Sequence, residues 1–171
     1  MASDGTRLST QEMHFFFLMA LGNAVIWHGQ LERKPLELDV ARPYPLRLRV
    51  YMYNCTNPPG GRPRDEYKSQ LIVPNQQRGA RGNFDNSDGR LVLLVAYAVL
   101  YGAPEEGVFI LYDALQHADF SYSANLQVKA DIINRALVEP VAIGRKTNKE
   151  IIIAAQREYL CEAIDKRITV G

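Results

Sequence analysis

The sequence predicts an α+β fold built on a mainly antiparallel or mixed sheet, with a pattern that also allows barrel-like closure. Segments with strand-like alternation and turns fill the middle of the chain, whereas helical patterns lie at both of its ends. The 171 residues are 47% apolar and 23% charged, an ordinary composition for a globular protein that buries a core. A single domain over residues 1–171 is therefore expected.

The first predicted element is a helix over Thr10–His28. Ser9 and Glu12 have the spacing of a capping box, in which each side chain bonds a free backbone amide of the other residue. The residues that follow are apolar nearly all round, which is typical of a buried helix. The apolar run is too short to span a bilayer and lacks the features of a signal peptide. We therefore expect no membrane partner. The two cysteines, which form no CxxC pair, fit a reduced, cytoplasmic location.

Strands are predicted next at Leu36–Ala41 and Leu46–Tyr53, because apolar and polar residues alternate in both. One face of the second strand carries two arginines and then two tyrosines. Such a face can contact phosphates and stack on bases. It can equally be the outer face of a sheet, with the tyrosines covering a neighbouring helix, and the pattern does not distinguish the two. The four residues are Arg47, Arg49, Tyr51 and Tyr53.

The remaining elements continue this arrangement. Pro74 ends a short strand, a continuous apolar run is long enough for a central strand, and the next apolar segment suits an antiparallel partner of that strand. The predicted strands are Glu66–Val73, Leu91–Leu100, Val108–Asp113 and Glu150–Ala154, and the predicted helices are Lys129–Leu137 and Gln156–Ile168.

Positive charge is concentrated in the middle of the sequence. Residues 42–90 hold nine Lys and Arg against four acidic residues, although the whole chain has a formal net charge of only +1. A local excess of this kind favours an anionic partner, and double-stranded DNA is the natural candidate. Scattered, solvated arginines are the alternative. The two cysteines form no CxxC pair and the three histidines lie far apart, so neither zinc nor another cofactor is expected.

Two Gly-rich loops carry much of this charge. Glycine lets a backbone approach a ligand closely, and arginine donates paired hydrogen bonds to a phosphate or to a guanine edge. We expect these loops to bind DNA, against the alternative of two mobile surface loops. The candidate residues are Arg62 and Arg64 in the first loop, Lys68 on the strand that follows, and Gln77, Arg78, Gly79 and Arg81 in the second loop.

A catalytic alternative uses the strand between the loops. Glu66 and Lys68 lie on the same face of that strand, and together with Asp39 they have the residue types of a Mg²⁺-dependent nuclease of the PD-(D/E)xK kind. The proline that usually precedes the first aspartate is absent here. Salt bridges to Arg64 or Arg47 would explain the same residues equally well.

The polar, aromatic loop His117–Ser123 is a further candidate. A histidine and an aspartate two residues apart do not make a catalytic triad without further support, and no GxSxG motif is present. This loop either presses on a ligand or forms a turn with Phe120 and Tyr122 packed inward.

Three stretches, NPPGGRPRDEYKSQL, QQRGARGNFDNSDGR and FSYSANLQV, resemble the sulfur-binding domains of type IV restriction endonucleases, which read phosphorothioate-modified DNA. The resemblance covers residues 45–130. It implies a pocket in which Gln77 and Arg78 face a tyrosine that is followed by proline. Tyr122 fits the tyrosine, but Ser123 stands where the proline is expected. The wall would then be completed by Ala124 or Leu126, next to Asn125.

The resemblance implies a non-enzymatic module of a restriction or phage-defence system, partnered by double-stranded, modified DNA and by a nuclease domain or subunit. Because sulfur is softer and less hydrated than oxygen, its reader should pair an apolar dimple with a cation. Arg62, Arg64 and Arg81 would hold flanking phosphates, which makes affinity fall with salt. A third interpretation is a protein-interaction domain whose arginine loops meet an acidic partner.

Overall fold

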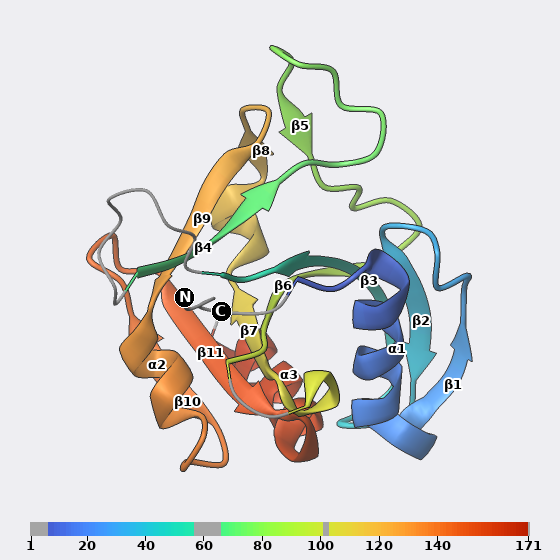
Figure 1. The fold of residues 1–171 in the computed structure, drawn as a ribbon. Coiled ribbons are helices and arrows are strands. Elements are labelled where there is room, and N and C mark those ends of the chain that lie inside the picture. Colours follow the sequence, from blue (N-terminus) through green and yellow to red (C-terminus); the bar gives the residue numbers. More distant parts are fainter. Residues whose placement is uncertain (1–6, 57–65, 101–102, 171) are drawn as a thin grey trace.

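The computed structural model describes residues 7–56, 66–100 and 103–170, and its centre is a seven-stranded mixed sheet (Figure 1). The strand order is β1-β2-β3-β6-β7-β11-β10, in which β3 and β6 are parallel and the other neighbours are antiparallel. The described strands form an open sheet rather than a barrel, which confirms the α+β class. The bounds are β1 Val25–His28, β2 Leu36–Val40, β3 Leu46–Asn54, β6 Leu91–Ala98, β7 Val108–Tyr112, β10 Ala142–Arg145 and β11 Ile151–Gln156.

The two faces of this sheet carry different covers. Helices α1 (Thr10–Leu21) and α3 (Leu160–Val170) pack on one face. The other face is covered by two small antiparallel sheets and a short helix, α2 (Ala130–Arg135). One small sheet pairs β4 (Glu66–Leu71) with β9 (Ala124–Lys129), and the other pairs β5 (Gly82–Asn83) with β8 (Asp119–Phe120). Single 3-10 turns occur at Gly22–Ala24, Pro104–Glu106, Ala114–His117 and Arg157–Tyr159.

Strand β6 shows why the sheet is buried on both sides. Its side chains alternate between the layers: Leu93 and Val95 contact the helices, whereas Val92 and Leu94 contact the small sheets. A strand that is covered on both faces reads as a continuous apolar run, as this one does. The predicted central position of this strand and its antiparallel pairing with β7 are both confirmed.

The capping box predicted at the N-terminus of α1 is present. The Ser9 hydroxyl accepts a hydrogen bond from the Glu12 amide at 3.1 Å, and the Glu12 carboxylate accepts one from the Ser9 amide at 2.9 Å. The prediction that this helix continues to His28 is wrong. It ends at Leu21 because Gly22 has a φ of 57°, a left-handed value that closes the helix. The apolar residues that follow form β1, an edge strand of the large sheet.

The other predicted elements are found with small shifts in their bounds. The closing helix begins at Leu160, after a 3-10 turn, and the helix predicted from Lys129 spans Ala130–Arg135. Five of the described strands were not predicted. β1 lies within the predicted first helix, and β5 and β8 are two-residue strands within the predicted loops. β9 begins after the predicted loop His117–Ser123 and includes Lys129, the first residue of a predicted helix, and β10 forms the second edge of the large sheet.

The tyrosines on the polar face of β3 are core residues. Tyr51 and Tyr53 are 3% and 5% exposed beneath the small sheets, so they are not free to stack on bases. Arg49, on the same face, is also buried and holds Glu37 in an ion pair with a nitrogen–oxygen distance of 2.7 Å. These three residues are therefore not available to nucleic acid, and their cover is the small sheets. Arg47 of the same face is exposed and donates to the Asp88 carbonyl at 2.8 Å.

No helix in the described ranges combines the length and apolarity that crossing a membrane requires.

Candidate nucleic-acid interface

Two consecutive β-turns shape the second Gly-rich loop. In Val73–Gln76 the Gln76 amide donates to the Val73 carbonyl at 3.1 Å, and in Gln77–Ala80 the Ala80 amide donates to the Gln77 carbonyl at 2.9 Å. The third residue of each turn, Asn75 and Gly79, has a positive φ of 68° and 85°. Asparagine and glycine are the residues that tolerate this conformation, which is typical of type II turns. The second turn therefore places Arg78 at its tip.

The side chain of Gln76 locks the two turns together. Its carbonyl oxygen accepts from the Val73 amide at 3.1 Å, and its amide nitrogen donates to the Ala80 carbonyl at 3.0 Å. A loop that is cross-linked by such bonds holds its arginine in a defined place, so less side-chain and backbone entropy is lost when a ligand binds.

A third turn, Ser121–Ala124, presents Tyr122 in the same way. The Ala124 amide donates to the Ser121 carbonyl at 3.2 Å, and Ser123 has a φ of 61°. Proline is fixed near a φ of about −65° and cannot adopt this conformation. The serine in place of the expected proline therefore reflects a different backbone, and this turn departs from the sulfur-binding pattern in geometry as well as in sequence.

The β5–β8 pair brings these turns together although they lie about 40 residues apart. Gly82 pairs with Phe120 and Asn83 with Asp119, at the top of the view in Figure 1. As a result, the Arg78 guanidinium carbon lies 6.0 Å from the centroid of the Tyr122 ring. We call Arg78 and Tyr122 the turn-tip pair. The sequence predicted that these two loops meet, and the structure places them in contact.

The other predicted residues surround the turn-tip pair to different extents. Gln77, Gly79 and Asn125 are exposed, and Ala124 is half-buried and packs against the core. Asn125 and Ala124 begin β9, where they pair with Gln70 and Leu71 of β4. Arg62 and Arg64 lie outside the described residues.

The cations predicted from the loops differ in their ion-pair and hydrogen-bond partners. Arg81 forms an ion pair with Asp119 at 2.9 Å, with both side chains more than half exposed. Arg90 is nearly buried and donates to Asp39 and to the carbonyls of Leu38 and Leu48. Arg78 has neither an acidic partner nor a hydrogen bond within the described ranges, and it is exposed. Sequence alone did not reveal these partners, because they come from distant segments.

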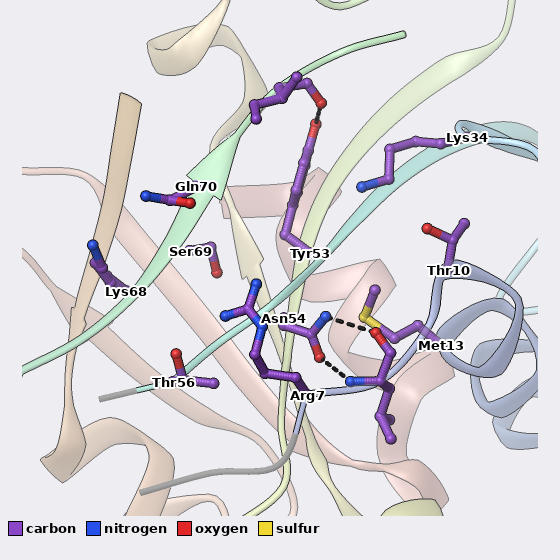
Figure 2. Close-up of a pocket in the computed structure, with 12 residues that line it drawn as sticks. Arg7, Thr10, Met13, Lys34, Tyr53, Asn54, Thr56, Lys68, Ser69 and Gln70 are labelled. Carbon is purple, nitrogen blue, oxygen red and sulfur yellow. Dashed lines mark hydrogen bonds between the residues drawn. The ribbon is translucent and has the colours of Figure 1, made fainter. Parts of the chain in front are cut away.

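Lys68 borders a separate hollow between α1, β3 and β4, which we call the N-terminal cavity (Figure 2). Its volume is about 430 Å³. No sequence pattern indicates this site, because its cations are far apart in the chain and no motif links them. Its polar lining includes Arg7, Thr10, Lys34, Lys68, Ser69 and Gln70.

The nuclease residues are not assembled in the described structure. Asp39 lies on β2 and pairs with Arg90 at 3.0 Å, whereas Glu66 and Lys68 lie on β4 of a different sheet. Within the described ranges, no three His, Cys, Asp or Glu side chains are grouped so that they could hold a metal ion. This arrangement gives the catalytic alternative no support.

The His117–Ser123 loop divides between core and surface. His117 bonds the buried carboxylate of Glu150 at 2.9 Å, and Phe120 is 5% exposed against Phe84. The Glu150 carboxylate is desolvated by burial, but hydrogen bonds from His117 and from the Asp113 amide lower its pKa overall. His117 thus has a structural partner, and Tyr122 remains the half-exposed aromatic residue of the loop.

A model of the methylase-associated X1 family matches residues 46–164. The chain belongs to this family. This family is linked to restriction-modification systems, and the matched part of the chain is a domain of that kind. The matched range contains the turn-tip pair and Lys68, whereas Arg7 and Lys34 precede it. No curated protein and no solved structure matches the chain.

Proposed function

We propose that this methylase-associated X1 domain is a DNA-binding module of a restriction or defence system, and that residues 1–171 act as one domain. The single observation that carries the proposal is the turn-tip pair. An exposed guanidinium without an acidic partner in the described structure lies against an aromatic ring at the tip of a braced loop. Guanidinium groups bind phosphate oxygens with paired hydrogen bonds, and aromatic rings contact sugars and bases.

Family membership supports the same partner. Proteins that work with methylases in restriction-modification must recognise DNA or act beside it, and the matched range includes both turns. An acidic protein is the competing ligand for exposed arginines. It would not need the Tyr122 ring, whereas a nucleic acid can use both members of the turn-tip pair.

The experiment that tests DNA binding is fluorescence anisotropy of a labelled duplex titrated with the whole chain at several salt concentrations. We expect Arg78→Ala to weaken binding by about tenfold, the loss of one charge-assisted hydrogen bond. The slope of log affinity against log salt should fall by about 0.9, the value for one phosphate contact. Arg81→Ala should have a smaller effect because Asp119 already neutralises that guanidinium.

The matched control is Lys166→Ala, which removes one positive charge from the exposed side of α3 on the opposite layer of the sheet. It should leave the affinity unchanged. If Arg78→Ala and Lys166→Ala bind the duplex equally well, the turn-tip pair is not the contact surface.

A finer proposal is that the site reads a modified backbone. Tyr122 supplies apolar atoms beside the Arg78 charge, and Ala124 lies two residues further along the same turn. An apolar surface next to a cation is the combination that favours sulfur over oxygen. Normal, methylated and phosphorothioate duplexes of one sequence should be compared in the same titration. We expect the phosphorothioate duplex to bind most tightly, and we expect Tyr122→Ala to remove that preference. Equal affinity for all three duplexes would mean that the site binds DNA without distinguishing these modifications.

A further inference from the structure

We propose that the N-terminal cavity binds a phosphate-bearing ligand of mononucleotide size. The cavity is separate from the turn-tip pair, and the inference does not depend on DNA binding there. Arg7, Lys34 and Lys68 come from three separate parts of the sequence and line the same hollow. None of the described residues that line it is acidic, and none of the three cations has an acidic partner in the described structure. A hollow with this charge favours an anion.

Ser69 provides an independent reason to expect a ligand. Its side chain is almost fully buried, at 2% exposure, and its hydroxyl finds no nitrogen or oxygen partner among the described residues. The thiol of Cys55 lies near this hydroxyl, but a thiol is a weak partner. Figure 2 shows the hydroxyl pointing toward the space between Arg7 and Thr56. A buried hydroxyl that lacks a partner is costly, so a ligand oxygen that bonds to it is favoured.

Lys34 is held without the solvation that an ammonium group prefers. Burial lowers its pKa to about 8, and its nitrogen lies 3.9 Å from the centroid of the Tyr53 ring. The ring supplies a cation–π contact but no negative charge. An anion in the cavity would compensate the desolvated ammonium, and Figure 2 shows Lys34 on one side of Tyr53 with Arg7 and Ser69 on the other.

The start of helix α1 adds to this field. Thr10 is the first residue of this 12-residue helix and lines the cavity, so the N-terminal end of α1 borders it. The partial positive charge of a helix N-terminus stabilises phosphate groups. The nearest acidic side chain in this turn, Glu12, is occupied by the capping box and does not line the cavity.

The size of the cavity sets the kind of ligand. Its volume of about 430 Å³ falls in the range of roughly 300–1,000 Å³ that holds small molecules, well above what one phosphate needs. Gln70 adds an exposed amide at the rim, which can bond a base or a sugar. A mononucleotide combines this size with the required charge, and it can be free in solution or belong to a DNA strand.

The test is isothermal titration of the whole chain with inorganic phosphate, deoxyadenosine monophosphate, deoxyadenosine and a short single strand. We expect the monophosphate to bind at least about tenfold more tightly than the nucleoside, because charge-assisted hydrogen bonds to phosphate are lost in the latter. Binding of the free monophosphate identifies a nucleotide site. Binding of the strand alone identifies a site for a nucleotide within DNA if Ser69→Ala weakens it and Arg78→Ala does not. Failure of all four probes, or equal binding of nucleoside and monophosphate, overturns the proposal.

Variants locate the site. Ser69→Ala and Arg7→Gln should each weaken the monophosphate by about tenfold, the effect of removing one such bond. The melting temperature of Ser69→Ala should not fall, since its hydroxyl has no nitrogen or oxygen partner in the free protein. That of Arg7→Gln should not fall either, because Arg7 is exposed. Arg33→Gln is the control, because Arg33 is exposed and does not line the cavity. Unchanged affinity in both site variants would place the ligand elsewhere and contradict this assignment.

Discussion

The guanidinium groups of Arg78 and Arg81 lie on one loop but have different surroundings. Arg81 is neutralised by Asp119, whereas Arg78 contacts only the Tyr122 ring among the described residues. Exposed ion pairs contribute about 0–1 kcal/mol, so Arg81 can exchange Asp119 for a phosphate at little cost. Arg78 has no acidic partner to give up among the described residues, so binding a phosphate adds a complete ion pair. The difference between the two residues therefore decides which of them dominates binding.

A single residue also links the N-terminal cavity to stability. The pKa of Lys34 is lowered by burial from 10.5 to about 8. Between these two values the unfolded chain binds more protons than the folded chain, so stability should rise as pH increases through this window. We expect Lys34→Met to increase the free energy of unfolding at pH 7 by about 1 kcal/mol, because it removes the desolvated charge but also the contact with Tyr53.

Urea denaturation of the wild type and of Lys34→Met at pH 8 and pH 10.5 measures this effect. The difference between the two proteins should shrink toward the higher pH. Arg33→Met, next to it but exposed, should show no such trend. A wild-type protein that loses stability relative to Lys34→Met as the pH rises would show that the ammonium is well compensated in the free protein.

At the scale of elements, the sequence predicted the features that depend on residues close together in the chain. The capping box of α1 and the alternation of β2 and β3 depend on neighbouring residues, and both are found as expected. The end of α1 was missed because the apolar run continues past Gly22 into β1 without a change in composition. Strand β9 was missed because its partner, β4, lies more than 50 residues earlier. Which layer covers Tyr51 depends on such long-range pairing.

The β5–β8 pair is the element that holds the site together. A Cβ atom on Gly82 would lie 2.7 Å from a ring carbon of Phe120 and 2.6 Å from the side-chain oxygen of Gln76. Gln76 could move only by breaking its bonds to both turns. We expect Gly82→Ala to destabilise the fold by about 1–3 kcal/mol, as overpacking usually does, and to weaken duplex binding with it.

Chemical denaturation and duplex titration of the same protein measure both effects. Asn83→Ala, one residue further along β5 and exposed, should change neither. If Gly82→Ala were destabilised yet bound the duplex as well as the wild type, the strand pair would not be needed to position Arg78. Unchanged stability would contradict the expected overpacking.

At the scale of the whole molecule, the two proposed sites are formed by different parts of the chain near β4. The N-terminal cavity borders the strand itself, whereas Arg78 lies in the second of the two turns that follow it. Sequence reasoning found the second site because both loops carry recognisable Gly, Arg and Tyr residues. It missed the first because Arg7, Lys34 and Ser69 are brought together only by the packing of α1 against β3.

Crossed titrations test whether the sites are separate. Arg78→Ala should weaken the duplex but not deoxyadenosine monophosphate, and Ser69→Ala should weaken the monophosphate but not the duplex. Effects of distant, independent substitutions add, so the double variant should show both losses and no more. A loss of both ligands in either single variant would indicate one continuous surface.

Asn54 connects the matched domain to the segment that precedes it. Its side-chain amide bonds the backbone of Leu8 in both directions, at 2.7 Å and 2.8 Å, and so imitates one rung of a strand ladder. Asn54 lies inside the range that matches the family, but Leu8 and Arg7 precede it. A methylase-associated X1 domain joined to a different leading segment would keep its arginine turn and lose a cavity wall. The proposed cavity of this chain thus depends on a segment outside the matched domain, whereas its arginine turn lies within that domain.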